Sequence, residues 1–271
     1  QMPRLLGLAM ASKVYKSVKF EGSEKFSKDG NEVAFGTIGD ASTAEGHFWE
    51  TLNAACALQV TMVGSIWDDG YGMSVPTQNQ RAKADISEML SGFQRKAEEK
   101  QGCEIIQVKA WDYPALMEAY AKVEHYARYE SVPVVIHVTE VTQPQGHSTS
   151  GSHERYKNEE RLKWESEFDG MLKFREWILD YSIEIEGNEE YLASVEELDA
   201  IDSESKKLVK DGQKKAWESY QKTISDLKNE VLPFVESIKN QNVEVTQLIE
   251  NFNKIISKSK RDIFHLVRQS L

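Results

Sequence analysis

A strand–helix–strand pattern near the start of the chain constrains the fold more than any other feature. Residues 33–38 form a short apolar run rich in β-forming side chains, and this run ends just before Asp40. Apolar side chains then recur on one helical face through residues 45–58, and residues 61–67 form a second apolar run. The pattern predicts a βαβ unit, and therefore a parallel sheet that binds ligands at the carboxyl ends of its strands.

Two aspartates follow the two predicted strands. Asp40 and Asp69 each stand just past a strand end and lie 29 positions apart in the sequence. Small residues and a helix start follow Asp40, so backbone N–H groups are available there for an anionic group. Carboxylate oxygens are ligands that Mg²⁺ prefers. The arrangement predicts a cation bound together with a phosphate group.

The residues around these aspartates resemble the thiamine diphosphate motif, a Gly-Asp-Gly followed about thirty residues later by Asn-Asn. More narrowly, residues 39–53 and 68–76 resemble the alpha subunit of the decarboxylating dehydrogenase component of 2-oxo acid dehydrogenase complexes. The resemblance implies thiamine diphosphate and Mg²⁺ as cofactors. It implies that the side chains of Asp40 and Asp69 and the backbone carbonyl of Tyr71 bind the metal. The implied cofactor-binding set is Gly39, Asp40, Ala41, Ser42, Asp69, Tyr71, Met73 and His147.

Two positions depart from the family pattern. Ala41 replaces the last glycine of the first half, a change that costs little where φ is negative. Asp68-Asp69 replaces Asn-Asn, which places extra negative charge beside the diphosphate. In the alternative interpretation, Asp68 and Asp69 are ordinary turn residues before Gly70.

Helical and strand-like segments alternate as far as residue 139. Helices are expected over residues 2–16, 79–100 and 112–127, and strands over 103–108 and 132–138. This alternation predicts an α/β fold with a doubly wound, mainly parallel sheet, the fold of a diphosphate-binding domain in the family that the chain resembles. From residue 158 the sequence is helical and charged, which predicts a C-terminal helical extension.

The predicted domains are therefore a diphosphate-binding α/β domain over 1–157 and a helical region over 158–271. The helical region is also a candidate linker to a fused beta domain. The family that this chain resembles carries a longer N-terminal segment. We therefore expect that part of the first domain is missing and that the sequence is a piece of a longer protein.

A second polar segment follows the last predicted strand. Residues 140–156 are rich in Gly and Ser and should lie at the same sheet edge as the two aspartates. They resemble the family's mobile Gly-His-Ser loop, although the family's Thr-Tyr-Arg run is absent. The resemblance implies that His147 is catalytic and reaches the diphosphate, and that Ser148 stands where animal enzymes are phosphorylated. Alternatively, His147 is a surface residue; His125 and His137 are expected to be structural.

The resemblance implies an enzyme for oxidative decarboxylation of a 2-oxo acid, with acyl transfer to a lipoyl group. The His-Ser-Thr-Ser sequence favours the branched-chain type. The alternatives are a pyruvate dehydrogenase component, a transketolase-like enzyme, and a non-catalytic assembly module. The implied partners are a beta subunit or fused beta domain, which would complete the site in a heterotetramer, and a lipoyl-bearing acyltransferase core. This chain alone would hold an incomplete site.

Composition argues against several other classes of protein. A net charge of −11 without a run of Lys or Arg argues against nucleic-acid binding. There is no apolar stretch near twenty residues, so no membrane partner is expected. The two cysteines, Cys56 and Cys103, suggest no disulfide framework or metal spacing. A cytoplasmic protein of bacterial type is the expectation.

Overall fold

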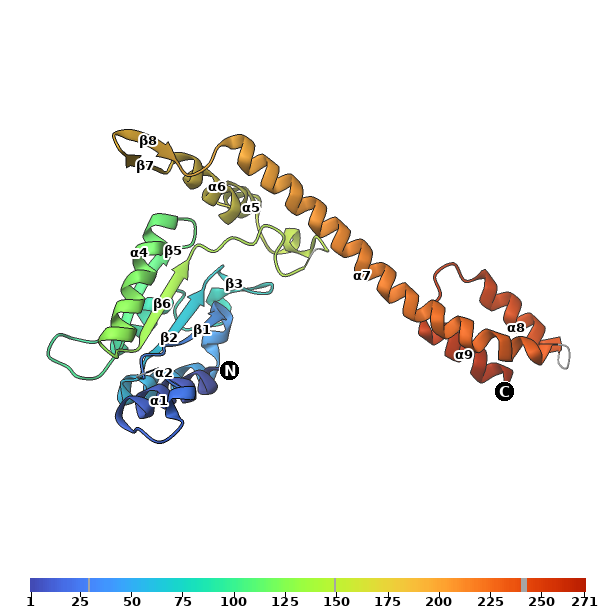
Figure 1. Ribbon diagram of the computed structural model, residues 1–271, viewed down its shortest axis with the longest axis horizontal. Helices are drawn as coiled ribbons and strands as arrows, with labels where there is room; N and C mark the ends of the chain where they lie inside the picture. Colours follow the sequence, from blue (N-terminus) through green and yellow to red (C-terminus); the bar gives the residue numbers. More distant parts are fainter. Residues whose placement is uncertain (29, 149, 240–242) are drawn as a thin grey trace. The chain divides into compact units, whose positions relative to one another are not determined.

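The computed structural model describes residues 1–271 except 29, 149 and 240–242. It forms two compact units, residues 1–192 and residues 193–271, which are described separately (Figure 1). The domain boundary expected between residues 157 and 158 stays a prediction about domain organisation.

The first unit is built on a four-stranded parallel sheet. Its strands are β1 (Ala34–Gly39), β2 (Met62–Trp67), β6 (Val134–Thr139) and β5 (Glu104–Lys109), in that spatial order. Gly39 pairs with Trp67, and Trp67 pairs with Val138, so three neighbouring strands end level with one another. The segments that follow these strands therefore meet at one edge of the sheet.

Helices cover both faces of the sheet (Figure 1). Helices α1 (Met2–Ser17), α2 (Gly46–Leu58) and α3 (Ile86–Leu90) contribute to a buried core with one set of alternating strand residues. Helix α4 (Tyr113–Glu124), extended by a π-helical turn, packs on the opposite set. Alternate strand residues point to opposite faces, which explains the two cores. The predicted doubly wound α/β fold is confirmed.

The helix expected over residues 79–100 is wrong in its length. The structure forms α3 between two 3-10 turns, η3 (Thr77–Asn79) and η4 (Ser91–Phe93). Asp85 caps α3 by accepting a hydrogen bond from the Glu88 N–H at 3.0 Å, and this fixes the helix start. The apolar periodicity was real, because Ile86 and Leu90 are fully buried, but it extends over a shorter segment.

The first unit also contains short elements after the strands: η2 (Asp40–Ala44), β3 (Tyr71–Gly72), β4 (Val75–Pro76) and η6 (Ser152–Arg155). Helices α5 (Glu159–Glu167) and α6 (Gly170–Asp180) precede an antiparallel hairpin of β7 (Ser182–Ile185) and β8 (Asn188–Tyr191). Tyr113 at the start of α4 packs against Phe174 of α6, with ring centroids 4.4 Å apart. This contact ties α6 to the sheet layer.

The second unit consists of helices. It contains α7 (Val195–Ser237), α8 (Val243–Lys254) and α9 (Lys260–Ser270). The C-terminal extension was predicted to be helical from residue 158, and the structure has helices there, but the β7–β8 hairpin interrupts them between α6 and α7. Ser194 begins α7 with a capping box, in which its hydroxyl accepts from the Glu197 N–H. The buried side chains of this unit form a separate core, whose members are Ile224, Val235, Val245, Ile249, Phe252, Ile263 and Leu266.

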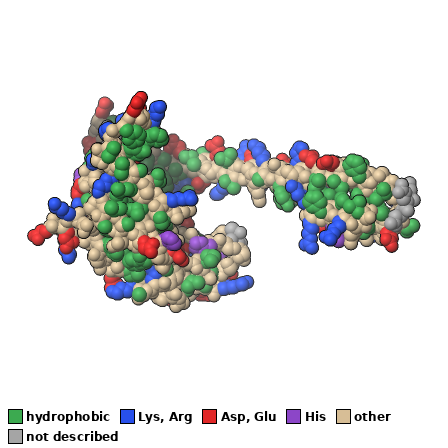
Figure 2. All heavy atoms as spheres, turned by 90° about the horizontal axis from the view of Figure 1, so that it is seen from below, with side chains coloured by type: hydrophobic (Ala, Val, Ile, Leu, Met, Phe, Trp, Pro, Cys, Tyr) green, Lys and Arg blue, Asp and Glu red, His purple; other side chains and the backbone are tan. Residues whose placement is uncertain are grey.

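Charged side chains of both signs are interspersed on the face shown in Figure 2. Within the part of the chain that the structure describes, no helix is both long enough and apolar enough to cross a bilayer.

Candidate functional site

A cavity of about 480 Å³ lies at the carboxyl ends of the parallel strands. Residues from the ends of β1 and β2, from the β3 hairpin and from the loop after β6 line it. All eight residues that the sequence predicted for cofactor binding are among them: Gly39, Asp40, Ala41, Ser42, Asp69, Tyr71, Met73 and His147. The fold therefore brings the two motif halves and the predicted loop histidine to one place.

Asp40 is buried at the first turn after β1, with 2% of its surface exposed. The 3-10 turn η2 begins there, and the Thr43 hydroxyl donates to the Asp40 carbonyl at 2.6 Å. Burial, and then the nearby charges of Asp68 and Asp69, raise the pKa of Asp40 to about 6. Its carboxylate is thus in an environment in which an additional positive charge would be favourable.

Asp68 faces the protein interior. Its Oδ2 lies 3.0 Å from His137 Nε2 and 3.7 Å from a terminal nitrogen of Arg81. Burial opposes ionisation of Asp68, but hydrogen bonds from His137 and the Gly70 N–H outweigh it and lower the pKa of Asp68. His137 is buried and also contacts the Ser87 hydroxyl at 2.9 Å through Nδ1. Its role here is to hold Asp68.

Asp69 lines the cavity from the turn after β2. Its Oδ1 accepts a hydrogen bond from the Tyr71 N–H at 3.1 Å, and Gly70 between them has φ +80°. A left-handed residue is needed for this turn, which is why glycine suits the position. The Asp69 carbonyl accepts from Arg161 at 2.7 Å. Burial raises the pKa of Asp69.

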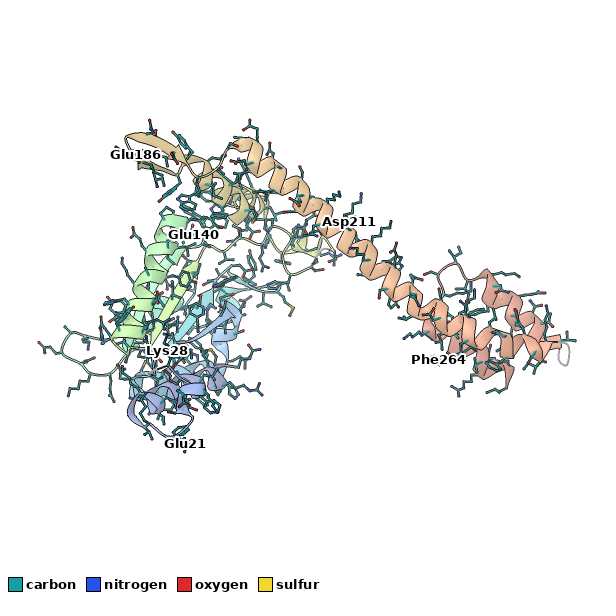
Figure 3. All side chains as sticks on the ribbon, in the orientation of Figure 1. Glu21, Lys28, Glu140, Glu186, Asp211 and Phe264 are labelled. Carbon is teal, nitrogen blue, oxygen red and sulfur yellow. The ribbon has the colours of Figure 1, made fainter. Side chains whose placement is uncertain are left out.

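His147 approaches Asp69 from the loop after β6. Its Nε2 lies 3.8 Å from Asp69 Oδ2, and 45% of its side chain is exposed. The loop starts at Glu140, whose carboxylate accepts a hydrogen bond from Trp111 Nε1 at 2.6 Å (Figure 3). The Ser148 hydroxyl donates to the Ser150 hydroxyl at 2.8 Å, and neither residue lines the cavity.

Backbone hydrogen bonds join the Asp69 turn to this loop. The Asp68 N–H donates to the Val138 carbonyl at 2.9 Å, and the Val141 N–H donates to the Asp68 carbonyl at 3.0 Å. The segments after β2 and β6 therefore continue as paired backbone beyond the sheet.

A buried ion pair supports the far side of the loop. Lys157 Nζ lies 2.8 Å from both carboxylate oxygens of Glu165 and 2.8 Å from the Gln143 carbonyl. Arg161 Nε lies 2.8 Å from Glu165 Oε1 and also reaches the Asp69 carbonyl described above. Sequence reasoning missed this cluster; the Arg161–Glu165 spacing of four residues on a helix was its visible signal.

Comparison with known proteins decides the family. The model of the dehydrogenase E1 component family matches residues 1–225. The chain belongs to this family. The dehydrogenase E1 relatives include the pyruvate dehydrogenase E1 component subunit alpha of Rickettsia prowazekii, 25% identical over 66% of this chain and 48% of that protein.

Two further relatives are named for pyruvate and for a branched-chain 2-oxo acid. The pyruvate dehydrogenase E1 component subunit alpha of Acholeplasma laidlawii is 30% identical over 64% of this chain and 44% of its own length. A mitochondrial 2-oxoisovalerate dehydrogenase subunit alpha 2 of Arabidopsis thaliana is 27% identical over 66% of this chain and 33% of its own length. The chain thus spans about half, or less, of the length of these relatives. The predicted resemblance to the alpha subunits of 2-oxo acid dehydrogenases is confirmed.

The donor chemistry at the cavity fits the thiamine diphosphate that the dehydrogenase E1 family implies, and it also fits the Mg²⁺ that the sequence predicted. Asp40 and Asp69 supply carboxylates from two turns, and Tyr71 supplies a backbone carbonyl. These are hard oxygen ligands, and Mg²⁺ is commonly held by one or two carboxylates together with substrate phosphates. Within the described residues, no cluster of three or more His, Cys, Asp or Glu side chains is placed to hold a metal. A metal here would rely on the diphosphate and on backbone oxygen as well as on the two carboxylates.

The two cavity turns pack tightly at Gly72. A Cβ added there would lie 2.9 Å from the Ala41 Cβ, on the turn that carries Asp40. We expect Gly72→Ala to push the turns apart and weaken thiamine diphosphate binding by about tenfold, since overpacking costs roughly 1–3 kcal/mol. Calorimetric titration of the full assembly measures this, with Gly46→Ala as control because a Cβ at Gly46 meets nothing within 4 Å. Equal affinities in the two variants would contradict the expected contact.

Proposed function

We propose that this chain supplies the Mg²⁺–diphosphate half of the site in a thiamine diphosphate-dependent 2-oxo acid dehydrogenase. The observation that carries the proposal is the single cavity that collects Asp40, Asp69, Tyr71 and His147 from three strand ends. The family match over residues 1–225 supports it. Bound thiamine diphosphate would supply the carbanion-stabilising chemistry that the protein side chains lack.

Each cavity residue then has a defined task. Asp40 and Asp69 bind the metal through carboxylate oxygens, and Tyr71 binds it through its carbonyl. The N–H groups of Ala41 and Ser42 face the anionic diphosphate, and Gly39 and Met73 contact the cofactor. Among the described residues of the loop, His147 is the one titratable side chain that lines the cavity, and we assign to it proton transfer and contact with the diphosphate.

The rest of the active site comes from a partner. We propose a beta subunit, or a beta domain of the same polypeptide, within a heterotetramer-like assembly that delivers acyl groups to a lipoyl-bearing acyltransferase core. The alpha-subunit names of the relatives support this partner. We propose the bacterial cytoplasm as its location.

The substrate is a 2-oxo acid. The His-Ser-Thr-Ser sequence at 147–150 favours a branched-chain substrate, whereas pyruvate dehydrogenase is named more often among the relatives. Decarboxylation assays of the full assembly with 2-oxoisovalerate, pyruvate and 2-oxoglutarate separate these candidates. Faster turnover of pyruvate would overturn the branched-chain assignment and leave the rest intact.

Calorimetric titration of thiamine diphosphate into the full assembly tests the cofactor site. We expect saturable binding that requires Mg²⁺ and is abolished by a chelator. An assembly that binds no thiamine diphosphate at millimolar concentration would contradict the proposed function and would favour a non-catalytic assembly module.

A further inference from the structure

Arg81 is buried behind the cavity, and the family motif does not include it. Its side chain is 1% exposed, and it does not line the cavity. One terminal nitrogen donates to the Asp40 carbonyl at 2.8 Å and to Asp40 Oδ2 at 3.2 Å. The other donates to the Ala84 carbonyl at 3.1 Å and lies 3.7 Å from Asp68 Oδ2. One guanidinium thus touches the turn after β1 and the turn after β2.

Three carboxylates meet at this point: Asp40 and Asp69 are buried, and the side chain of Asp68 is 13% exposed. Asp40, Asp68 and Asp69 are all within the two turns, and their mutual repulsion is strong away from bulk water. An unpaired buried charge is costly, so carboxylates in such positions are paired and hydrogen-bonded. Arg81, with His137 on the other side of Asp68, supplies that pairing.

The shape of the guanidinium matters as much as its charge. Two terminal nitrogens in one plane allow contact with the backbone of Asp40, its carboxylate and Asp68 at the same time. A lysine ammonium is a point charge and cannot span these groups in fixed geometry. Because Arg81 holds both the carbonyl and Oδ2 of Asp40, it fixes the orientation of a carboxylate whose residue lines the cavity.

We propose that Arg81 is the positioning residue of the diphosphate site: it sets the Asp40 carboxylate and offsets the charge of Asp68, so that an anionic diphosphate can approach. This rests on the proposed function and assigns to this arginine the role of balancing the charges of Asp40 and Asp68. In this proposal Asp68 supports the site through its contacts with Arg81 and His137, and Asp40 and Asp69 bind the metal.

The test is the dissociation constant of thiamine diphosphate for the full assembly, measured by calorimetry at saturating Mg²⁺. Arg81→Gln adds one net negative charge next to the anionic cofactor, and we expect binding to weaken by about tenfold or more, the range for groups that orient metal ligands. Arg81→Lys keeps the charge and should weaken binding less, by about threefold. Asp68→Asn alone should remain within about threefold of the wild type.

The double variant distinguishes a loss of charge balance from a loss of fold stability. Asp68→Asn combined with Arg81→Gln restores the net charge, so we expect recovery of most of the lost affinity. A merely structural arginine would show no such recovery. Arg95→Gln is the matched control. Arg95 pairs with Glu104 and Glu130 at 2.9 Å, at the amino end of β5, whereas the cavity lies at the carboxyl ends of the strands.

The outcomes distinguish the two proposals. A wild-type assembly that binds no thiamine diphosphate overturns the proposed function and this inference with it. Wild-type binding together with unchanged affinity in Arg81→Gln, or no recovery in the double variant, overturns only the role of Arg81. Melting of the cofactor-free assembly is measured in parallel, and the affinity recovery must occur without a matching change in melting temperature.

Discussion

Replacing Asp40 with asparagine is expected to weaken Mg²⁺-dependent binding of thiamine diphosphate to the full assembly by about 100-fold or more. Removing a group that only orients a metal ligand costs about 10–100-fold, so loss of a charged ligand should reach or exceed the upper end. Titration calorimetry with Mg²⁺ present measures the change. Asp112→Asn is the matched control, because Asp112 caps α4 outside the cavity and asparagine caps equally well.

The fold should tolerate this replacement. The folded-state pKa of Asp40, about 6, lies above its ordinary value of 3.8. A carboxyl with a raised folded-state pKa destabilises the fold as pH rises from its ordinary value of 3.8 to about 6, so ionised Asp40 lowers the stability at neutral pH. The variant removes this cost while it weakens the contact with Arg81, and the two effects oppose each other. Binding that stays at the wild-type level in Asp40→Asn would remove the metal from the proposed site.

Replacing Lys157 with methionine is expected to lower the free energy of unfolding of the first unit by about 3 kcal/mol. Breaking a buried ion pair costs roughly 3–5 kcal/mol because the remaining charge is left uncompensated. Arg161 still contacts Glu165 in the variant, which places the expected loss near the lower end. Denaturant unfolding monitored in the full protein measures it. Lys163→Met on α5, the helix that carries Glu165, is the control, because Lys163 is exposed.

A second variant separates charge from packing in this cluster. Lys157→Met combined with Glu165→Leu removes both buried charges, and such replacements by apolar residues are often neutral. We expect the double variant to regain most of the lost stability. If it were as unstable as Lys157→Met, packing rather than the unpaired carboxylate would explain the loss.

The sequence predicted the parts of this molecule that depend on local patterns. The apolar runs at β1, β2, β5 and β6 and the helices α2 and α4 follow directly from periodicity, and the family follows from the two motif halves. Strand ends in a parallel sheet must share an edge, so the proximity of Asp40, Asp69 and His147 was also deducible. Their roles in cofactor binding remain predictions.

The missed residues depend on contacts across long stretches of sequence. Arg81 lies 41 positions from Asp40, near the start of the helix expected over residues 79–100, and an arginine there is typical of a solvated helix face. His137 was assigned correctly to structure, but its partner Asp68 was assigned to the motif alone. Single-sequence patterns do not reveal which side chain of a doublet turns inward. Asp68 turns inward because the buried guanidinium of Arg81 and the imidazole of His137 contact its carboxylate there.

The backbone pairing of Asp68 with Val138 and Val141 has a consequence for how this site tolerates change in chain length. Residues 138–141 continue the ladder of the sheet, so an extra residue there would shift the register and rotate the Asp69 turn. Residues 144–148 follow this paired stretch, and lengthening them would leave the turn in place. Insertions and deletions among family members, natural or engineered, should therefore occur after Gln143. The number of residues in the segment 138–141 should stay constant.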